Sequence, residues 1–393
     1  MRARPRVLHV IGSLDIGGAE KQIVEIVRGL AGRFEFHVGL LSSGGPLEPL
    51  VRAEGAEIHP LASRGAASPA HRLWRAARAR SRLRSLLRGL DPDIIHSWLF
   101  EGSFLAALSR WPAHVPPLIV SRRSLVGWIA RHPSYYPLAR WTNGQADILL
   151  ANAEAVRADV IRKERVESGR VQVIYNGVDT SVYTPGPADE KLRREAGLPE
   201  GLPVVGMVAN IHTYKGHGEV VEAVAALRDE GFRCALLFVG RDGDATVRLR
   251  ERIDALGLEN VVFAGARGDV PRMLRLMDVF VSASHEEGFS NSILEAMSSG
   301  RAIVTTSVGG SVEQIENGAN GFVVPPHSPV SLAAAVARLL GDPSMREALG
   351  TAARKTAIGK FGLERVLEET AALYERLAPQ SRGSGNSAGA SGP

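Results

Sequence analysis

Short apolar runs alternate with longer amphipathic stretches along most of the chain. The runs are rich in β-branched residues, as in RVLHVIGSL (6–14) and DILLAN (147–152), and segments such as AEKQIVEIVRGLAG (19–32) have helical spacing. Further runs of the same kind are FEFHVGLLS (34–42), AEIHPLA (56–62), DIIHSW (93–98) and PLIVSRR (117–123). This alternation of strand and helix patterns predicts parallel sheet flanked by helices.

The alternation is interrupted at 176–203, which is rich in Gly, Pro and charge, and then starts again. Six more strands are predicted by VVGMVAN (204–210), ALLFVG (235–240), VVFAG (261–265), VFVSAS (279–284), AIVTT (302–306) and FVVP (322–325), with helices over 216–231, 244–257, 290–300 and 331–341. Two doubly wound α/β domains of similar size follow from this pattern. Ligands of such sheets bind beyond the carboxyl ends of the strands, so we expect a cleft between the domains to hold the chemistry.

The expected division of the chain is an N-terminal domain over 1–180, a C-terminal domain over 181–362 and a final amphipathic helix over 363–378. Residues 379–393 are small and polar, and we expect a disordered tail there.

Composition supports a globular protein without disulfides. The 393 residues are 45% hydrophobic and include one cysteine, Cys234, within an apolar run, which excludes an internal disulfide and most cysteine-based metal sites. The N-terminal stretch lacks the long apolar region of a signal peptide, and no run approaches the length of a membrane-spanning helix. We therefore expect a cytoplasmic protein.

Charge is unevenly distributed between the two halves. Residues 1–150 carry 20 basic and 11 acidic side chains, a net charge of +9, whereas the remainder carries 27 and 31, a net charge of −4. This asymmetry suggests an anionic partner for the N-terminal half. The segment HRLWRAARARSRLRSLLRGL (71–90) is the most basic part, and it is compatible with a helix on an anionic membrane or with a packed surface helix. Nucleic acid is not expected, because aromatic residues for base stacking are not interleaved.

The stretch HEEGFSNSILEAMSSG (285–300) combines two carboxylates with a helix start. Glu287 precedes the helix and Glu295 lies about two turns inside it, and between them Ser290, Asn291 and Ser292 are suitable capping residues. Exposed N–H groups at a helix start favour phosphate, while carboxylates accept hydrogen bonds from sugar hydroxyls. The order suits a nucleotide sugar, with the hexose at Glu287, the pyrophosphate at the helix start and the ribose at Glu295. The alternative is that both acids are solvated surface residues.

Glu287 and Glu295 match the Glu-x7-Glu motif of the retaining glycosyltransferases of family 4, and EGFSNSILEAM resembles the block in which that motif lies. The resemblance covers about residues 6–375. It implies the GT-B architecture, in which two Rossmann-like doubly wound parallel-sheet domains face a central cleft. It also implies substrate contacts by Gly288, Phe289, Ser290 and Asn291 of this block.

Further blocks extend the resemblance around the cleft. Gly17 and Gly18 in SLDIGGAEKQ (13–22) are similar to the donor-contacting glycine loop of the family, although the same residues would also suit a plain strand-to-helix turn. Lys215 in VGMVANIHTYKGH (205–217) is placed to neutralise a leaving diphosphate. The family often has an Arg five residues before this Lys, and some relatives have one three residues before it.

In this chain Asn210 and His212 occupy those two positions, and Arg241 is a candidate substitute for the missing cation. The block VFAGARGDVPRML (262–274) resembles the nucleobase-holding part, near Ala266 and Arg267. In SVGGSVE (307–313), Gly309 and Gly310 are expected to be close-approach glycines, and Glu313 is expected to be structural.

The N-terminal domain offers fewer matches. His96 lies where the family often has His-x-His. It is either a catalytic residue or a hydrogen-bonded core residue. Trp98 replaces the second His and is a hypothetical stacking surface for a sugar or acceptor ring. Arg122 and Arg123 suit a phosphate or carboxylate on the acceptor, or the plain surface.

The resemblance implies transfer of a sugar from a nucleotide-sugar donor to a saccharide or lipid-linked acceptor, with retention, without a cofactor and without a metal. An epimerase of the same architecture is one alternative. A non-catalytic basic module that binds membrane or nucleic acid is another, and it is disfavoured by Lys215 and the two glutamates. The expected location is the cytoplasm, with peripheral binding to the inner face of the cell membrane as an option.

Overall fold

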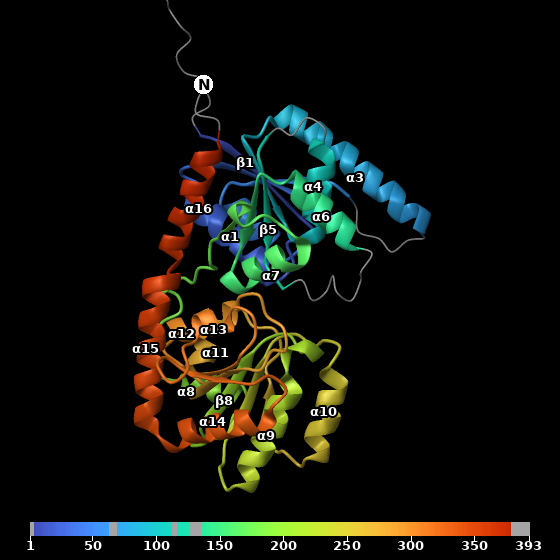
Figure 1. The fold of residues 1–393 in the computed structure, drawn as a ribbon. Helices are drawn as coiled ribbons and strands as arrows, with labels where there is room; N and C mark the ends of the chain where they lie inside the picture. The colour runs from blue at the N-terminus through green and yellow to red at the C-terminus, as the bar shows by residue number, and fades with distance from the viewer. Residues whose placement is uncertain (1–3, 63–68, 112–115, 126–134, 379–393) are drawn as a thin grey trace, which may run out of the picture.

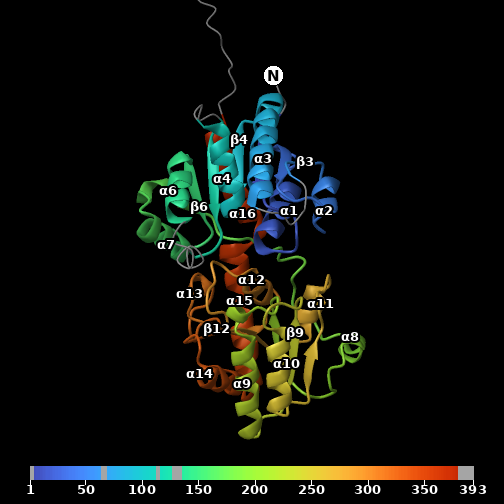
Figure 2. The same ribbon diagram turned by 90° about the vertical axis from the view of Figure 1, so that its right-hand side faces the viewer.

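The structure, a computed structural model, describes residues 4–62, 69–111, 116–125 and 135–378, and in the helix that begins at Pro69 it describes side chains from Trp74 onward. The expected tail over 379–393 lies outside the described residues. Figure 1 shows two α/β domains stacked one on the other, and Figure 2 shows the same arrangement from the side.

A seven-stranded parallel sheet forms the centre of the N-terminal domain. Its strand order is β3-β2-β1-β4-β5-β6-β7. The strands are β1 (Arg6–Ile11), β2 (Glu35–Leu40), β3 (Glu57–Pro60), β4 (Ile94–Trp98), β5 (Leu118–Arg122), β6 (Ile148–Ala151) and β7 (Val171–Val173). The helices that cover it are α1 (Gly18–Leu30), α2 (Glu48–Ala53), α3 (Pro69–Leu90), α4 (Leu99–Arg110), α6 (Tyr135–Gln145) and α7 (Glu154–Glu164).

The C-terminal domain has a six-stranded parallel sheet in the order β10-β9-β8-β11-β12-β13. Its strands are β8 (Val204–Val208), β9 (Ala235–Val239), β10 (Val261–Phe263), β11 (Val279–Ser282), β12 (Ala302–Thr306) and β13 (Phe322–Val324). Its helices are α8 (Glu190–Glu195), α9 (His217–Asp229), α10 (Thr246–Ala255), α11 (Val270–Arg275), α12 (Asn291–Ser298), α13 (Ser311–Gln314) and α14 (Pro329–Gly341). The predicted class, two doubly wound parallel-sheet domains, is confirmed.

Two long helices at the end of the chain join the domains along one side, as the red ribbon in Figure 1 shows. Helix α15 (Pro343–Phe361) packs on α12 of the C-terminal domain, and α16 (Leu363–Leu377) packs on α1 of the N-terminal domain. The chain crosses between domains at Val178 and again at Gly362, which form a backbone bridge. Val178 N–H donates to the Phe361 carbonyl and Leu363 N–H to the Val178 carbonyl, each over 3.0 Å. The two crossings therefore lie side by side.

The carboxyl edges of the two sheets face each other. The loop after β1 contacts the loops after β9 and β11, through Arg241 to the Ile16 carbonyl and Asn291 to the Gly18 carbonyl. The inner strands are apolar and almost fully buried because helices cover both faces of each sheet, whereas the edge strands β3, β7 and β10 are partly exposed. Polar side chains are concentrated at the strand ends, where the two domains meet.

Candidate active site

The motif over 285–300 lies in the loop after β11 and in the first turns of α12. Ser290 is the N-cap of this helix, and its hydroxyl accepts a hydrogen bond from Ile293 N–H over 3.3 Å, which confirms the predicted capping. Glu287 precedes the cap, and Glu295 lies in the helix. Apart from Ile293 N–H, which Ser290 caps, the first N–H groups of α12 have no acceptor within the helix.

Glu287 is paired with Lys215, which ends the short 3₁₀-helix Thr213–Lys215 after β8. The Lys215 Nζ atom lies 2.6 Å from Oε2 of Glu287, and the two side chains are 20% and 15% exposed. Burial alone would lower the pKa of Lys215, but the charge and hydrogen bond of Glu287 outweigh it and raise that pKa. A hydrogen-bond-accepting carboxylate and a fixed positive charge thus share one half-buried position.

Two glycines hold the Glu287 loop in place. Gly310 N–H donates to the Gly288 carbonyl over 2.8 Å. Gly309 has φ +48°, and a Cβ atom there would lie 1.7 Å from the Glu287 carbonyl oxygen. The prediction that Gly309 and Gly310 are close-approach glycines is confirmed, because neither position has room for a side chain.

A second helix N-terminus, in the other domain, lies close to the first. Helix α1 begins at Gly18 after its N-cap Gly17, and the Asn291 side chain donates to the Gly18 carbonyl over 3.3 Å. The starts of α1 and α12 therefore lie close together, each with unpaired N–H groups and a positive dipole end. Such a pair of helix starts is suited to a diphosphate.

Glu295 also faces the opposite domain. Its Oε1 atom lies 3.0 Å from Nζ of Lys21 in α1, and the Tyr183 hydroxyl donates to the same carboxylate. The Glu295 charge is the largest cause that raises the pKa of Lys21, whereas desolvation followed by that charge raises the pKa of Tyr183. The Glu295 side chain is 8% exposed, so it is an interdomain ion pair and not a solvated surface acid.

The loops after β8 and β9 bring Asn210, His212 and Arg241 to the same edge. The Asn210 side chain accepts from Arg241 N–H over 3.1 Å, and the Arg241 guanidinium donates to the Ile16 carbonyl over 3.0 Å. His212 lies 2.6 Å from Asp244. Arg241 therefore reaches the glycine loop, and its role as a substitute for the cation missing at Asn210 stays a prediction.

Arg267 lies in the loop after β10. Its guanidinium makes two contacts of 2.7 Å with the two carboxylate oxygens of Asp269. This pair fixes the loop in which backbone contact with a nucleobase is expected.

His96 lies in the interior of the N-terminal sheet and not on the cleft surface. It is 0% exposed, and its ring nitrogens lie 2.6 Å from the Tyr374 hydroxyl and 2.7 Å from the Ser121 hydroxyl. Both nitrogens are thus used within the protein, as in the alternative of a hydrogen-bonded core residue. We do not retain His96 among the catalytic residues.

Trp98 is 1% exposed, stacks on His96 and donates from Nε1 to Nδ1 of His9 over 2.9 Å. The hypothesis that it stacks on a sugar or acceptor ring is wrong for this reason, because its faces are already covered. The guanidinium of Arg123 lies over its ring at 5.1 Å.

Arg122 and Arg123 follow different paths from the end of β5. Arg122 is buried and pairs with Glu164 of α7 over 2.8 Å, so it is a structural ion pair and not an acceptor site. Arg123 turns toward the C-terminal domain and donates to Asn176, whose amide in turn donates to Asn291 over 2.6 Å. Burial lowers the pKa of Arg123 to about 9, and the nearby Glu20 carboxylate opposes this.

Gly288 and Phe289 serve packing in this structure. The Phe289 ring is 4% exposed and lies 5.1 Å from the ring of Tyr175 and 5.3 Å from that of Phe361. A Cβ atom at Gly288 would lie 2.4 Å from the Arg123 carbonyl oxygen. Both residues therefore hold the backbone beside Glu287 against the N-terminal domain. The expected substrate contacts of Gly288, Phe289, Ser290 and Asn291 stay predictions.

Glu313 is structural, as expected. Its carboxylate accepts from the N–H groups of Glu154 and Ala155 at the start of α7, over 2.9 and 2.8 Å, and from the Tyr175 hydroxyl over 3.0 Å. A carboxylate of one domain thus caps a helix of the other and stabilises their relative position.

Sequence reasoning did not single out Lys21, Asn176 and Tyr183. Lys21 lies one turn after Gly17 and Gly18 on the same helix, so its spacing from the glycine loop was a usable signal. Asn176 and Tyr183 lie in or beside the segment interpreted as a linker, where no periodic pattern marks a residue.

Two parallel-sheet α/β domains that face each other at the carboxyl edges of their sheets define the GT-B fold. The family models Glycosyltransferase Family 4 and Glycosyl transferases group 1 match residues 16–182 and 188–356. The chain is 29% identical to the D-inositol 3-phosphate glycosyltransferase of Kineococcus radiotolerans, over 93% of this chain and 92% of that protein. It is 30% identical to the enzyme of the same name from Corynebacterium jeikeium, over 74% of each. The chain therefore belongs to glycosyltransferase family 4 and is a glycosyltransferase.

Solved structures agree on the fold. Anabaena Alr3699/HepE in complex with UDP and glucose has a TM-score of 0.82 at 23% identity, over 94% of this chain and 99% of that one. WaaG, a glycosyltransferase involved in lipopolysaccharide biosynthesis, has a TM-score of 0.73 at 19% identity, also over 94% and 99%.

The basic segment forms α3, which packs on the N-terminal sheet through Ala79, Leu83 and Leu90. This confirms that it is a packed helix, and it leaves several arginines, among them Arg84 and Arg88, on the exposed side. Within the described parts of the chain, no helix combines the length and apolar character needed to cross a bilayer.

Buried neutral histidines predict that the protein loses stability in mild acid. Burial lowers the pKa of His9 to about 3 and that of His217 to about 4, and that of His96 well below its usual value. The unfolded chain binds protons below about pH 6.5 where the folded chain does not, so stability falls as pH drops from that value toward the folded pKa. Each histidine should cost about 2 kcal/mol at pH 5.0, at roughly 1.4 kcal/mol per pH unit.

Urea unfolding at pH 7.0 and 5.0 measures this loss. His217→Gln should reduce the difference in unfolding free energy between the two pH values by the contribution of one histidine. Equal urea midpoints at pH 7.0 and 5.0 for the native chain would contradict the argument.

Proposed function

We propose that the protein is a retaining glycosyltransferase that moves a sugar from a nucleoside-diphosphate sugar to a saccharide or lipid-linked acceptor. The observation that carries this proposal is the Glu287–Lys215 pair beside the facing starts of α1 and α12. Hydroxyl groups of a sugar need the carboxylate, and the diphosphate needs the ammonium and the helix N–H groups. The UDP and UDP-glucose named in the complexes of Alr3699/HepE make a uridine donor our first choice.

In this proposal the chain supplies orientation and charge, and the leaving phosphate itself takes the acceptor proton. Lys215, Arg241 and the two helix starts stabilise the charge that develops on the diphosphate. Glu287 orients the sugar so that the acceptor oxygen can approach from the side of the leaving group. The proposed route uses no second carboxylate on the opposite side of the anomeric carbon. Glu295 is assigned to the ribose instead, and its carboxylate pairs with Lys21 of the other domain. Transfer is proposed to need neither metal nor cofactor.

The relatives support a hydroxylated cyclic or polysaccharide acceptor. Their names include D-inositol 3-phosphate glycosyltransferase, 2-deoxystreptamine glucosyltransferase of Streptomyces kanamyceticus and the putative glycosyltransferase EpsD of Bacillus subtilis. We propose a role in bacterial polysaccharide or glycoconjugate synthesis in the cytoplasm. The exposed arginines of α3 would allow contact with the anionic inner face of the cell membrane. Co-sedimentation with anionic vesicles, compared with neutral ones, tests this contact.

The proposal is tested first by the donor. A thermal-shift panel of UDP, GDP and ADP sugars should show stabilisation by one donor class. A transfer assay with that donor, in the presence of a chelator, should yield product whose anomeric configuration by NMR equals that of the donor. Inverted product would refute retention, and donor isomerised without any acceptor would favour the epimerase.

Glu295→Ala is expected to weaken nucleotide binding by about 10-fold or more, because a ribose would lose its charged hydrogen-bond acceptor. Lys21→Met is the matched control, since it breaks the same interdomain ion pair and keeps the carboxylate. Isothermal titration with the preferred nucleoside diphosphate measures both. Equal weakening in the two variants would assign the effect to the ion pair and remove the ribose contact from the proposal.

A further inference from the structure

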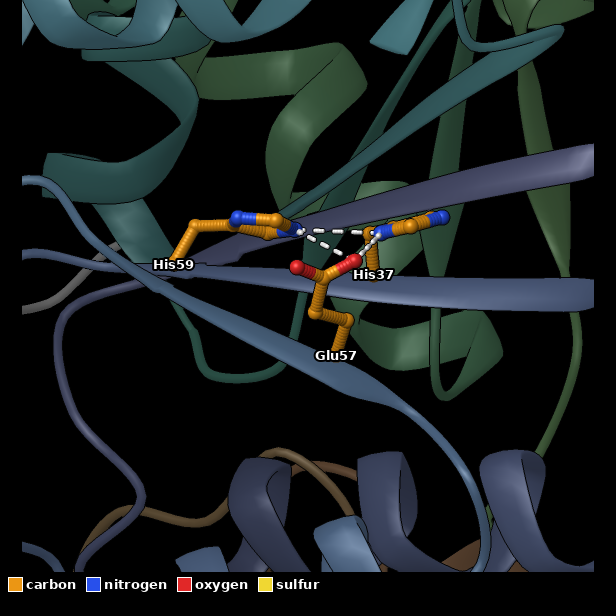
Figure 3. Close-up of side chains that lie close together, drawn as sticks. All are labelled: His37, Glu57 and His59. Carbon is orange, nitrogen blue, oxygen red and sulfur yellow. Dashed lines mark hydrogen bonds and ion pairs between the residues drawn. The ribbon is translucent and has the colours of Figure 1, made fainter.

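Two histidines and a glutamate converge on one point at the outer edge of the N-terminal sheet. His37 lies on β2, and Glu57 and His59 lie on the neighbouring strand β3, where His37 pairs in register with Glu57. Residues two apart on a strand share a face, so Glu57 and His59 both stand beside His37. Figure 3 shows the two rings and the carboxylate pointing toward one another.

The separations of the three facing atoms suit a metal ion. His37 Nδ1 lies 3.0 Å from His59 Nε2 and 3.4 Å from Glu57 Oε2, and His59 Nε2 lies 3.9 Å from the same oxygen. A triangle with these sides has a point about 2.0 Å from all three atoms, which is the bond length of zinc to histidine nitrogen and to carboxylate oxygen. Little movement of the side chains would be needed to bind the ion.

The second ring nitrogen of His37 is hydrogen-bonded to a carboxylate, as is usual for metal-bound histidines. This nitrogen, Nε2, lies 3.0 Å from Oε1 of Glu35, and Arg6 Nε donates to that same oxygen over 2.9 Å. A carboxylate on the second nitrogen places the proton there and leaves Nδ1 free to be a ligand. Arg6 also donates to the Leu90 carbonyl over 2.8 Å, which ties this support to the end of α3.

The site has an open side. The side chain of His37 is 5% exposed, whereas those of His59 and Glu57 are 21% and 66% exposed. A surface hollow of about 540 Å³ lies against His59, between β3 and the second half of α3. Three protein ligands with one position open to water are a common zinc arrangement. The hollow would admit that water or a small ligand.

We propose that His37, Glu57 and His59 bind one zinc ion, with Glu35 as the positioning residue behind His37. The ion would link β2 to the edge strand β3 next to α3. His37 is in register with Leu8, whose side chain packs in the same cluster as Leu83 of α3, so the site lies on the face of the sheet that α3 covers. It is therefore separate from the carboxyl edge that carries Glu287, and it takes no part in the proposed transfer.

A second group of this kind, Glu219, His285 and His327, must be controlled for. His285 Nε2 lies 2.7 Å from Glu219 Oε1, and His327 lies 3.5 Å from that same oxygen with a side chain that is 63% exposed. Here one carboxylate oxygen already holds His285 in a hydrogen bond. His327→Asn removes this group and leaves the proposed site intact.

The test is zinc titration of the full-length, tag-free protein after chelator treatment, with Co²⁺ absorption as a reporter of ligand geometry. We expect one equivalent of zinc at micromolar concentration in the native chain and in His327→Asn. His59→Asn should lose at least about 100-fold in affinity, and Glu35→Gln about 10-fold or more. Zinc should raise the melting temperature of the native chain by about 3 °C or more and should not raise that of His59→Asn.

Glu57→Gln controls for misfolding of His59→Asn. Because Glu57 is exposed, this variant removes a metal ligand without disturbing the core. No zinc uptake by the native chain would overturn the proposal, as would equal uptake by His59→Asn and Glu57→Gln. A mere hydrogen bond between His37 and His59 predicts that outcome. Sugar transfer that persists in chelator while the melting temperature falls would support the zinc site independently of the proposed function.

Discussion

Glu287→Gln is expected to lower turnover about 100-fold and to leave nucleoside-diphosphate binding unchanged or slightly tighter. The substitution keeps the shape of the side chain but removes the charge that orients the sugar, and a 100-fold loss corresponds to about 2.7 kcal/mol of transition-state stabilisation. Binding of the diphosphate should not suffer, because Glu287 now holds Lys215 at 2.6 Å and competes with phosphate for it. Initial rates and isothermal titration with the same nucleotide separate the two effects.

Lys215→Met is the matched partner of this variant. It should weaken diphosphate binding and turnover together, since it removes the positive charge itself. If Glu287→Gln retained native turnover, or if it lost nucleotide binding in step with Lys215→Met, the carboxylate would be serving only to hold the lysine, and the sugar contact would have to be assigned elsewhere.

The fold was predictable because its signals are local. Each run such as VFVSAS reads as a buried strand on its own, and the capping by Ser290 follows from the order of residues within one helix start. The confirmed close approach of Gly309 and Gly310 came from the resemblance, since the backbone they touch is more than 20 positions away.

Several elements escaped prediction, and two of them, β7 and α15, have a clear physical reason. Strand β7 (VQV) is an edge strand with a polar residue at its centre, so it lacks the apolar run that marks the equally short strands β10 (VVF) and β13 (FVV). Helix α15 presents small residues where a large apolar stripe is expected, because it packs closely on the end of α12. A Cβ atom at Gly350 would lie 2.3 Å from the Gly300 carbonyl oxygen, and Ala353 and Ala357 are fully buried. Small residues permit this close approach, and for the same reason the sequence of α15 lacks the large apolar stripe that would predict a buried helix.

Side-chain direction is the part that sequence reasoning did not reach. Arg122 and Arg123 are neighbours at one strand end, yet one turns into a buried pair with Glu164 and the other toward Asn291 through Asn176. Alternation along a strand separates neighbours onto opposite sides. The three proposed zinc ligands could not be predicted from the sequence for a related reason. His37 lies next to Glu57 and His59 only because β2 pairs with β3.

Gly309→Ala is expected to have the largest effect on the integrity of the site. The added Cβ would lie 1.7 Å from the Glu287 carbonyl oxygen at a residue with φ +48°, so the loop after β11 or the loop after β12 must move. Overpacking and the left-handed backbone together should cost about 2–4 kcal/mol of folding stability. Glu287 would shift away from Lys215, and turnover should fall at least as far as in Glu287→Gln.

Gly318→Ala separates the two causes, because Gly318 has φ +79° and no atom within 4 Å of an added Cβ. It should cost only about 1 kcal/mol, the backbone part, and should leave turnover unchanged. Denaturant unfolding and initial rates measure both variants. The close contact with Glu287 is supported if Gly309→Ala loses more stability and more turnover than Gly318→Ala. Equal losses in the two variants would show that Gly309 is an ordinary turn glycine that does not hold Glu287 in position.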